Sequence, residues 1–253
     1  MQSYLSTPAS QARGSSSIFK VSRTKLELFL DCKKCFYLEC KHGVRRPNSY
    51  SLALNNAVDK LLKKEFNLYR DAQKPHPLLL KYGLGRIVPL AHPSLLKWQN
   101  RYEGIQYAVP NTNIVLFGAL DDVWIDVNSK ELIVVDYKAT SQDGAISFGG
   151  QWQAMYERQL EVYRWLLRKN GHEVSEVSYF LYANAKNDAD FFNNQLNFDL
   201  SLVPHCVQGD SGWIEGVVMN IFECLKSNII PAACDGCQYC GYFSGRDQLV
   251  EGL

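Results

Sequence analysis

Apolar residues recur every three or four positions in several stretches of the chain, which predicts amphipathic helices. The first is expected to run from Ser22, as its N-terminal cap, to Gly43, where the pattern stops. Lys33 and Lys34 interrupt its apolar stripe, which indicates a bend or a functional face. Further helices are expected over about residues 53–69, 151–168 and 212–227.

Between about residues 104 and 200 the pattern changes to that of strands. Strands are expected over residues 104–110, 113–127, 131–140, 175–184 and 192–200. A turn at Asn128 and Ser129 separates the second from the third, so these two are expected to form a hairpin-like pair. The stretch 71–100 contains three prolines and is expected to be an irregular connection with a short helix. The chain therefore reads as an α/β protein.

The composition fits a globular protein of one large domain or two small ones, and no convincing linker divides the chain. Of 253 residues, 46% are apolar, enough for a sizeable core. No apolar run approaches a membrane span and the N-terminus lacks a secretory layout, so the expected location is the cytoplasm. Residues 1–17 are small, polar and Ser-rich and are expected to be a disordered tail ahead of a domain over 18–253. The net charge of +1 means that any polyanion site must be local.

The segment IVVDYKAT (133–140) delivers an acid and a lysine at the end of a strand. Alternation along the strand projects Asp136 and Lys138 to one face and Tyr137 to the other. The preceding strand contains Asp121, fifteen residues earlier across one tight turn. The two adjacent strands can place Asp121 and Asp136 within reach of one hard divalent cation, with Lys138 beside the attacking water.

The predicted helix after this hairpin offers two more polar groups. Gln159 and Tyr163 are four residues apart and share one helix face. Gly118-x-x-Asp121, Asp136-x-Lys138 and Gln159-x-x-x-Tyr163, on strand, strand and helix in this order, resemble the PD-(D/E)XK nuclease superfamily. Within it, the pattern is most similar to RecB-like nucleases and to CRISPR-associated adaptation exonucleases with terminal cysteines.

The resemblance implies a restriction-endonuclease-like core. This is a mixed central sheet flanked by helices, here with an N-terminal helical part and a cysteine-rich C-terminus. It implies metal ligation by Asp121 and Asp136, catalysis by Lys138, and an accessory pair of Gln159 and Tyr163. Asp59 stands where such relatives often carry a histidine, and an aspartate also binds Mg²⁺ or Mn²⁺.

The resemblance also implies a function. The expected protein is a divalent-metal-dependent DNA nuclease, an exonuclease that acts on single-stranded DNA or on free DNA ends. Its protein partners would belong to DNA repair, recombination or defence. Two alternatives stay open: a weak or inactive nucleic-acid-binding or assembly module of the same fold, and an interaction protein clamped by its cysteines.

Six of the eight cysteines lie near the two ends of the chain. Cys234, Cys237 and Cys240 follow one another at two-residue gaps, a spacing typical of zinc or iron–sulfur ligation. The resemblance implies that Cys32, with Cys35 as the alternative, completes a [4Fe-4S] cluster with these three. A zinc site made of the Cys32–Cys35 and Cys237–Cys240 pairs is the rival arrangement.

Overall fold

The computed structural model describes residues 18–47, 53–144, 146, 153–206 and 211–251 of the chain. The predicted tail, residues 1–17, lies outside them. The chain divides into two compact units: unit 1 comprises the described residues of 1–50, 108–116 and 212–253, and unit 2 those of 51–107 and 117–211. That residues 18–253 act as one domain stays a prediction.

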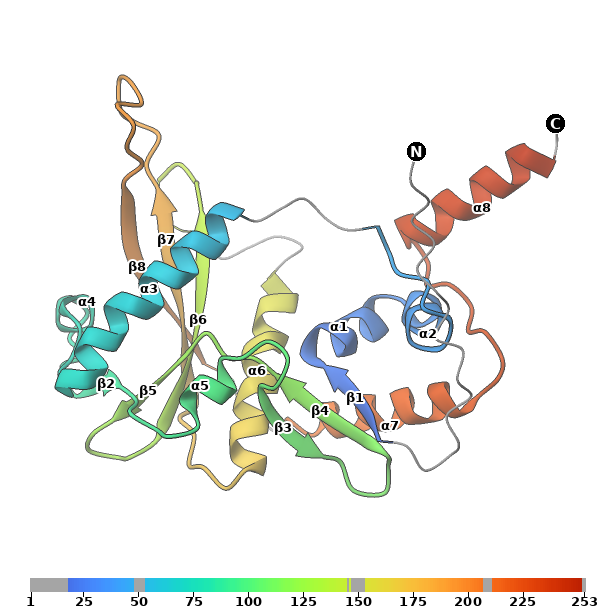
Figure 1. The fold of residues 1–253 in the computed structure, drawn as a ribbon, viewed down its shortest axis with the longest axis horizontal. Helices are drawn as coiled ribbons and strands as arrows, with labels where there is room; N and C mark the ends of the chain where they lie inside the picture. The colour runs from blue at the N-terminus through green and yellow to red at the C-terminus, as the bar shows by residue number, and fades with distance from the viewer. Residues whose placement is uncertain (1–17, 48–52, 145, 147–152, 207–210, 252–253) are drawn as a thin grey trace. The chain divides into compact units, whose positions relative to one another are not determined.

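Unit 2 is built on a five-stranded sheet with the order β2-β5-β6-β7-β8 (Figure 1). The strands are β2 (Ile87–Pro89), β5 (Asp122–Asp126), β6 (Leu132–Thr140), β7 (Val177–Ala185) and β8 (Phe198–Cys206). β6 and β7 are parallel and the other neighbours antiparallel, so the sheet is mixed. This confirms the expected α/β class and the expected β5–β6 hairpin.

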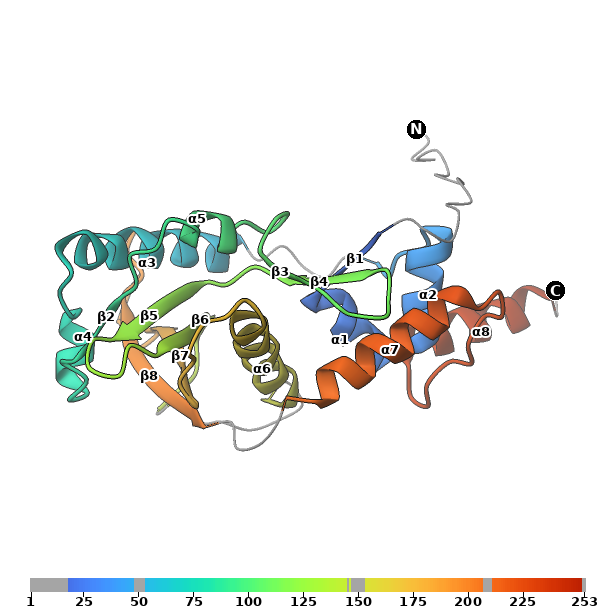
Figure 2. The same ribbon diagram turned by 90° about the horizontal axis from the view of Figure 1, so that it is seen from below.

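Two long helices cover opposite faces of this sheet, as Figure 2 shows for β5 and β6. The helices of unit 2 are α3 (Ala53–Ala72), α4 (Pro77–Lys81), α5 (Leu95–Trp98) and α6 (Gln153–Lys169). Val58, Leu62 and Phe66 of α3 pack in one core cluster with Val135 and Tyr137 of β6. The alternate residue Asp136 faces α6 instead, because successive strand residues project to opposite faces.

Unit 1 contains four helices among its described residues. They are α1 (Arg23–Asp31), α2 (Lys33–His42), α7 (Trp213–Lys226) and α8 (Gln238–Glu251). α7 packs against both α1 and α2. β1 (Phe19–Ser22), β4 (Ile114–Gly118) and β3 (Ile105–Ala108) form a three-stranded sheet in that order, and two of the boundaries between the units fall within β3 and β4. Within the part of the chain that the structure describes, no helix is long and apolar enough to cross a membrane.

The predicted first helix is capped as expected but is broken. The Ser22 side chain accepts the N–H of Lys25 at 3.2 Å, and Gly43 ends α2 with φ of 71°. Between them Cys32 has extended backbone (φ −159°, ψ 110°), which ends α1 and begins α2. The interruption of the apolar stripe thus marks a break in the helix, one residue before Lys33.

Other elements also differ from the sequence-based expectation, among them strands β1 and β2, which were not predicted. The predicted strand 113–127 is two strands, β4 and β5, which belong to different sheets. The last predicted strand begins at Phe198 and continues to Cys206. Helix α8 was not predicted, because its cysteine- and glycine-containing sequence has no apolar stripe.

Candidate active site

The carboxylates of Asp121 and Asp136 meet where the β5–β6 hairpin opens. The last ladder pair joins Asp122 to Val135, and the same register would place Asp121 opposite Asp136. Beyond this point β6 continues beside β7, whereas the other side of the hairpin departs toward β4. The N–H of Tyr137 is therefore not paired to β5, and Asp121 Oδ2 accepts it at 2.9 Å. The opening of the hairpin thus fixes one carboxylate beside the other.

Asp136 is a fully buried carboxylate with two partners. Gln159 Nε2, from α6, donates to its Oδ1 at 2.6 Å, and the ammonium of Lys138 forms an ion pair with its Oδ2. A buried charge is costly without such partners. Strand alternation predicts that Asp136 and Lys138 project to one face, and this ion pair agrees with that prediction.

The ammonium of Lys138 is held in place by more than Asp136. It lies 3.4 Å from Gln159 Oε1 and 4.3 Å from the centroid of the Tyr156 ring. An aromatic face attracts a cation through its quadrupole, and the attraction grows as water is excluded. Only 15% of the Lys138 side chain is exposed, so this positive charge has a defined position at the end of β6.

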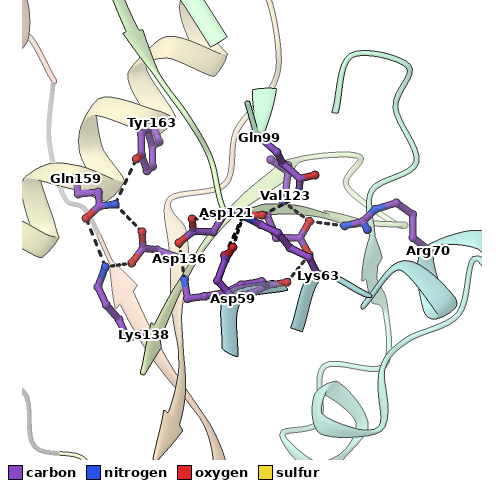
Figure 3. Close-up of polar contacts among 12 residues, drawn as sticks. Asp59, Lys63, Arg70, Gln99, Asp121, Val123, Asp136, Lys138, Gln159 and Tyr163 are labelled. Atoms are coloured by element: carbon purple, nitrogen blue, oxygen red, sulfur yellow. Dashed lines mark hydrogen bonds and ion pairs between the residues drawn. The ribbon is translucent and has the colours of Figure 1, made fainter. Parts of the chain in front are cut away.

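Helix α3 brings a third carboxylate and a second lysine to the same place. Lys63 Nζ lies 2.8 Å from Asp59 Oδ1 one helical turn away, and 3.9 Å from Asp121 Oδ1 (Figure 3). Sequence reasoning identified Asp59 but not Lys63. The available signal was the spacing of four residues, which puts Lys63 on the same helix face as Asp59.

The surroundings of Asp121 disfavour its charged form. Burial, together with the negative charge of Asp136, raises the pKa of Asp121 from 3.8 to about 7, although Lys63 and Lys138 oppose this shift. Two carboxylates that share a site cannot both ionise easily unless a cation compensates them. A bound cation would satisfy this electrostatic demand.

The neighbouring Asp122 has a different environment. Its carboxylate accepts the Tyr137 hydroxyl at 2.8 Å and the Trp124 indole N–H at 3.1 Å, and it forms an ion pair with Arg70. The side chains of Asp122 and Arg70 are 1% and 8% exposed. Asp122 therefore has a structural role on the α3 side of the sheet, and Asp121 is the aspartate of this pair that lies beside Asp136.

Gln159 and Tyr163 of α6 contact each other, and Gly118 makes room for the tyrosine. Gln159 Nε2 also lies 3.3 Å from Tyr163 Oη. A Cβ at position 118 would stand 2.6 Å from Tyr163 Cε1, closer than real Cβ contacts. The glycine of the Gly118-x-x-Asp121 motif thus allows α6 to approach the end of β4.

The structure brings together all the residues predicted for a divalent metal and for catalysis. In Figure 3 their side chains point toward one another from α3, from the β5–β6 hairpin and from α6. They are Asp59, Asp121, Asp136, Lys138, Gln159 and Tyr163. The carboxylate oxygens are the hard ligands that Mg²⁺ and Mn²⁺ prefer, and the raised pKa of Asp121 shows that its surroundings favour a reduction of negative charge, which a cation or a proton can supply.

The terminal cysteines form a second candidate metal site, within unit 1. Among the described residues, the ligand atoms of Cys32, Cys35, Cys237 and Cys240 lie within 4.8 Å of one another, so this tetrad could bind a metal. The predicted set contained Cys234 in place of Cys35. Cys234 is exposed and is not a member of the tetrad. Cys35, the predicted alternative, is a member.

Comparison with known proteins gives one family. The family model described as PD-(D/E)XK nuclease superfamily matches residues 20–244. No curated protein matches the chain. One solved structure, "Crystal structure of SSO0001", is 12% identical, with 93% of this chain and 88% of that chain covered and a TM-score of 0.38. A likeness this low adds nothing to the assignment, which depends on the family model.

Proposed function

The chain belongs to the PD-(D/E)XK nuclease superfamily, and we propose that it is a divalent-metal-dependent nuclease that hydrolyses phosphodiester bonds in DNA. The observation that supports this most directly is the convergence of Asp121, Asp136 and Lys138 at the open end of the β5–β6 hairpin. Within the superfamily we place the chain with the RecB-like exonucleases, because its three motifs occur in their order.

Asp121 and Asp136 would hold the cation, and Asp59 would be a third ligand from α3. Mg²⁺ or Mn²⁺ bound there would act as a Lewis acid on the scissile phosphate and lower the pKa of a bound water. The carboxylates would take up the cation most readily when ionised, so the raised pKa of Asp121 sets a competition between the cation and a proton.

Lys138 is the candidate catalytic group. Its ammonium would orient the attacking water and stabilise the negative charge that develops on the phosphate oxygens. Gln159 would position it, because its Oε1 lies 3.4 Å from Lys138 Nζ while its Nε2 donates to Asp136. One amide side chain therefore keeps the metal ligand and the catalytic lysine in a fixed relation.

One observation favours a weak or inactive nucleic-acid-binding module as a second candidate. The resemblance places Asp59 where similar nucleases often carry a histidine, and Asp59 is already paired with Lys63 at 2.8 Å. An acid that keeps its lysine partner would contribute less to cation binding. The cleavage experiment below separates the two candidates.

The experiment is a cleavage assay on end-labelled single-stranded and double-stranded DNA, with Mg²⁺, Mn²⁺ or EDTA. We expect cleavage with a divalent cation, none in EDTA, and a loss of at least about a hundredfold in Lys138→Met. Lys186→Met is the matched control, because Lys186 is half exposed and pairs with Asp199 at 2.9 Å, away from the site. Absence of divalent-dependent cleavage, or cleavage that survives Lys138→Met, would contradict the nuclease proposal.

A further inference from the structure

Two cysteine pairs from opposite ends of the sequence meet in unit 1. Cys35 Sγ lies 3.7 Å from Cys237 Sγ and 3.6 Å from Cys240 Sγ, and Cys32 Sγ lies 3.9 Å from Cys240 Sγ. Cys32 and Cys35 are buried, and Cys237 and Cys240 are half-buried. The four sulfur atoms therefore form one compact group from segments about two hundred residues apart in the chain.

Each pair sits at the start of a helix. Cys32 precedes α2 and Cys35 lies in its first turn, while Cys237 precedes α8 and Cys240 lies in its first turn. The carbonyl of each first cysteine accepts an N–H four residues on: Cys32 from Phe36 at 3.0 Å and Cys237 from Gly241 at 2.9 Å. The two pairs thus share one local geometry, with each pair at the N-terminal end of a helix.

The spacing of the sulfur atoms discriminates between one ion and a cluster. Four thiolates about 2.3 Å from a tetrahedral Zn²⁺ lie about 3.8 Å from one another. The three sulfur–sulfur distances above, from 3.6 to 3.9 Å, match this value. A [4Fe-4S] cluster inserts a cube of iron and sulfide between its thiolates and keeps them farther apart. The tetrad does not fit the cluster that the resemblance implies.

We propose that Cys32, Cys35, Cys237 and Cys240 bind a single Zn²⁺ ion in a closed, four-thiolate structural site. Two C-x-x-C pairs are a common zinc-binding arrangement, and soft thiolates select zinc over the hard cations expected at the carboxylates. With four protein ligands the ion has no open position, so its role is to hold α2 and α8 together. Cys234 is not a ligand.

Arg46 is placed to compensate the charge of such a site. Four thiolates and one Zn²⁺ carry a net charge of −2, and Arg46 Nη2 lies 3.6 Å from Cys237 Sγ. The guanidinium also lies 4.5 Å from the Tyr239 ring centroid and pairs with Asp31 at 2.5 Å. These contacts on two sides fix its position beside the tetrad, as expected for a residue that supports metal ligands.

The decisive experiment is elemental analysis of the full chain purified without oxygen from cells supplied with both iron and zinc. We expect one zinc per chain, almost no iron and a colourless protein. About four irons per chain with a brown colour, or neither metal, would overturn the proposal. The metal content is measured without DNA, so a result that contradicts the zinc proposal can be distinguished from one that contradicts the proposed nuclease function.

Two serine variants test which cysteines bind. Cys35→Ser is expected to lose most of the zinc, and Cys234→Ser is expected to keep it. The opposite pattern would support the predicted set of Cys32, Cys234, Cys237 and Cys240 and overturn the proposal. X-ray absorption at the zinc edge of the unaltered protein gives an answer even where Cys35→Ser does not fold. Four sulfur neighbours at about 2.3 Å support the site, and nitrogen, oxygen or fewer sulfur neighbours contradict it.

Arg46→Met is expected to lower zinc affinity roughly tenfold in competition with a coloured chelator. Arg45→Met is the matched control, because Arg45 is exposed and pairs with Glu39 at 4.0 Å. Equal affinities in the two variants would show that Arg46 does not act on the site.

Discussion

Gln159 donates a hydrogen bond of 2.6 Å to Asp136, a carboxylate whose side chain is completely buried. The amide oxygen of the same glutamine faces the ammonium of Lys138. In Gln159→Leu both contacts are lost, so we expect Mn²⁺ affinity and kcat/KM each to fall by about ten- to a hundredfold. Calorimetric titration and the cleavage assay measure the two effects. Gln153→Leu on the same helix is the control, because Gln153 pairs with Glu157, and an equal loss there would remove the specific role of Gln159.

Lys63 contacts both Asp59 and Asp121, so in the proposed nuclease it would compete with the metal ion for these carboxylates. Lys63→Met removes this competing charge, and the predicted result is Mn²⁺ binding that is about fivefold tighter, equivalent to about 1 kcal/mol. Calorimetric titration of Mn²⁺ measures it, with the exposed Lys60→Met on the same helix as the control. Weaker or unchanged binding in Lys63→Met would mean that the ammonium does not lie where the cation binds.

Asp121 and Asp122 are adjacent in sequence but are expected to respond oppositely to substitution. Asp122→Ala leaves Arg70 buried without its carboxylate, so the free energy of unfolding should fall by about 3–5 kcal/mol. Asp121→Ala should instead lose Mn²⁺ binding while it keeps most of its stability. Urea denaturation and metal titration of both variants check this, and a loss of Mn²⁺ binding in a folded Asp122→Ala variant would argue against it.

Gly118→Ala tests the packing of α6 at the site. The new methyl group would collide with the Tyr163 ring, and we expect a loss of about 1–3 kcal/mol in the free energy of unfolding. Gly216→Ala in α7 is the matched control, because nothing lies within 4 Å of its Cβ position. Since alanine favours a helix over glycine, that variant should gain about 0.5–1 kcal/mol. Thermal denaturation of both proteins gives the comparison.

The raised pKa of Asp121 predicts a pH-dependent stability difference in the metal-free protein. Between its ordinary value of 3.8 and about 7 the folded state holds a proton that the unfolded state has released. The stability from this group is therefore present at low pH and is lost as the pH rises through about 7. The asparagine side chain of Asp121→Asn does not ionise, so this variant does not lose that stability as the pH rises.

From about pH 5 to about pH 8, Asp121→Asn should therefore gain up to about 3 kcal/mol relative to the unaltered protein. Urea denaturation in EDTA at each pH measures this difference, and groups common to both proteins cancel. A difference that does not change with pH would show that the Asp121 carboxyl titrates in the same range in both states.

The sequence alone predicts most of the candidate active site, because its residues lie at short, regular separations. The two-residue period of β6 relates Asp136 to Lys138, and the four-residue period of α6 relates Gln159 to Tyr163. Lys63 was missed for a physical reason: a lysine on the polar face of an amphipathic helix normally faces water. Its role depends on the tertiary approach of α3 to Asp121, which no local pattern contains.

The differences between the predicted and the observed fold also have physical causes. Residues 114–126 are largely apolar and β-forming, so nothing in their pattern marks the point at which the chain leaves one sheet for another. The sequence also could not show whether Cys35 or Cys234 lies beside Cys32, Cys237 and Cys240. Each stands three residues from another cysteine, and which pairs meet is decided by the positions of α2 and α8.

Unit 1 combines segments that are far apart in the sequence, from residues 1–50, 108–116 and 212–253, which has a consequence for synthesis on the ribosome. Cys32 leaves the ribosome 208 residues before its neighbour Cys240, which corresponds to about 10–40 s of translation. During that interval unit 2 can fold, while the early thiols remain without their partners. Nascent chains would therefore be most sensitive to oxidants and to metal supply until Cys240 has been synthesised.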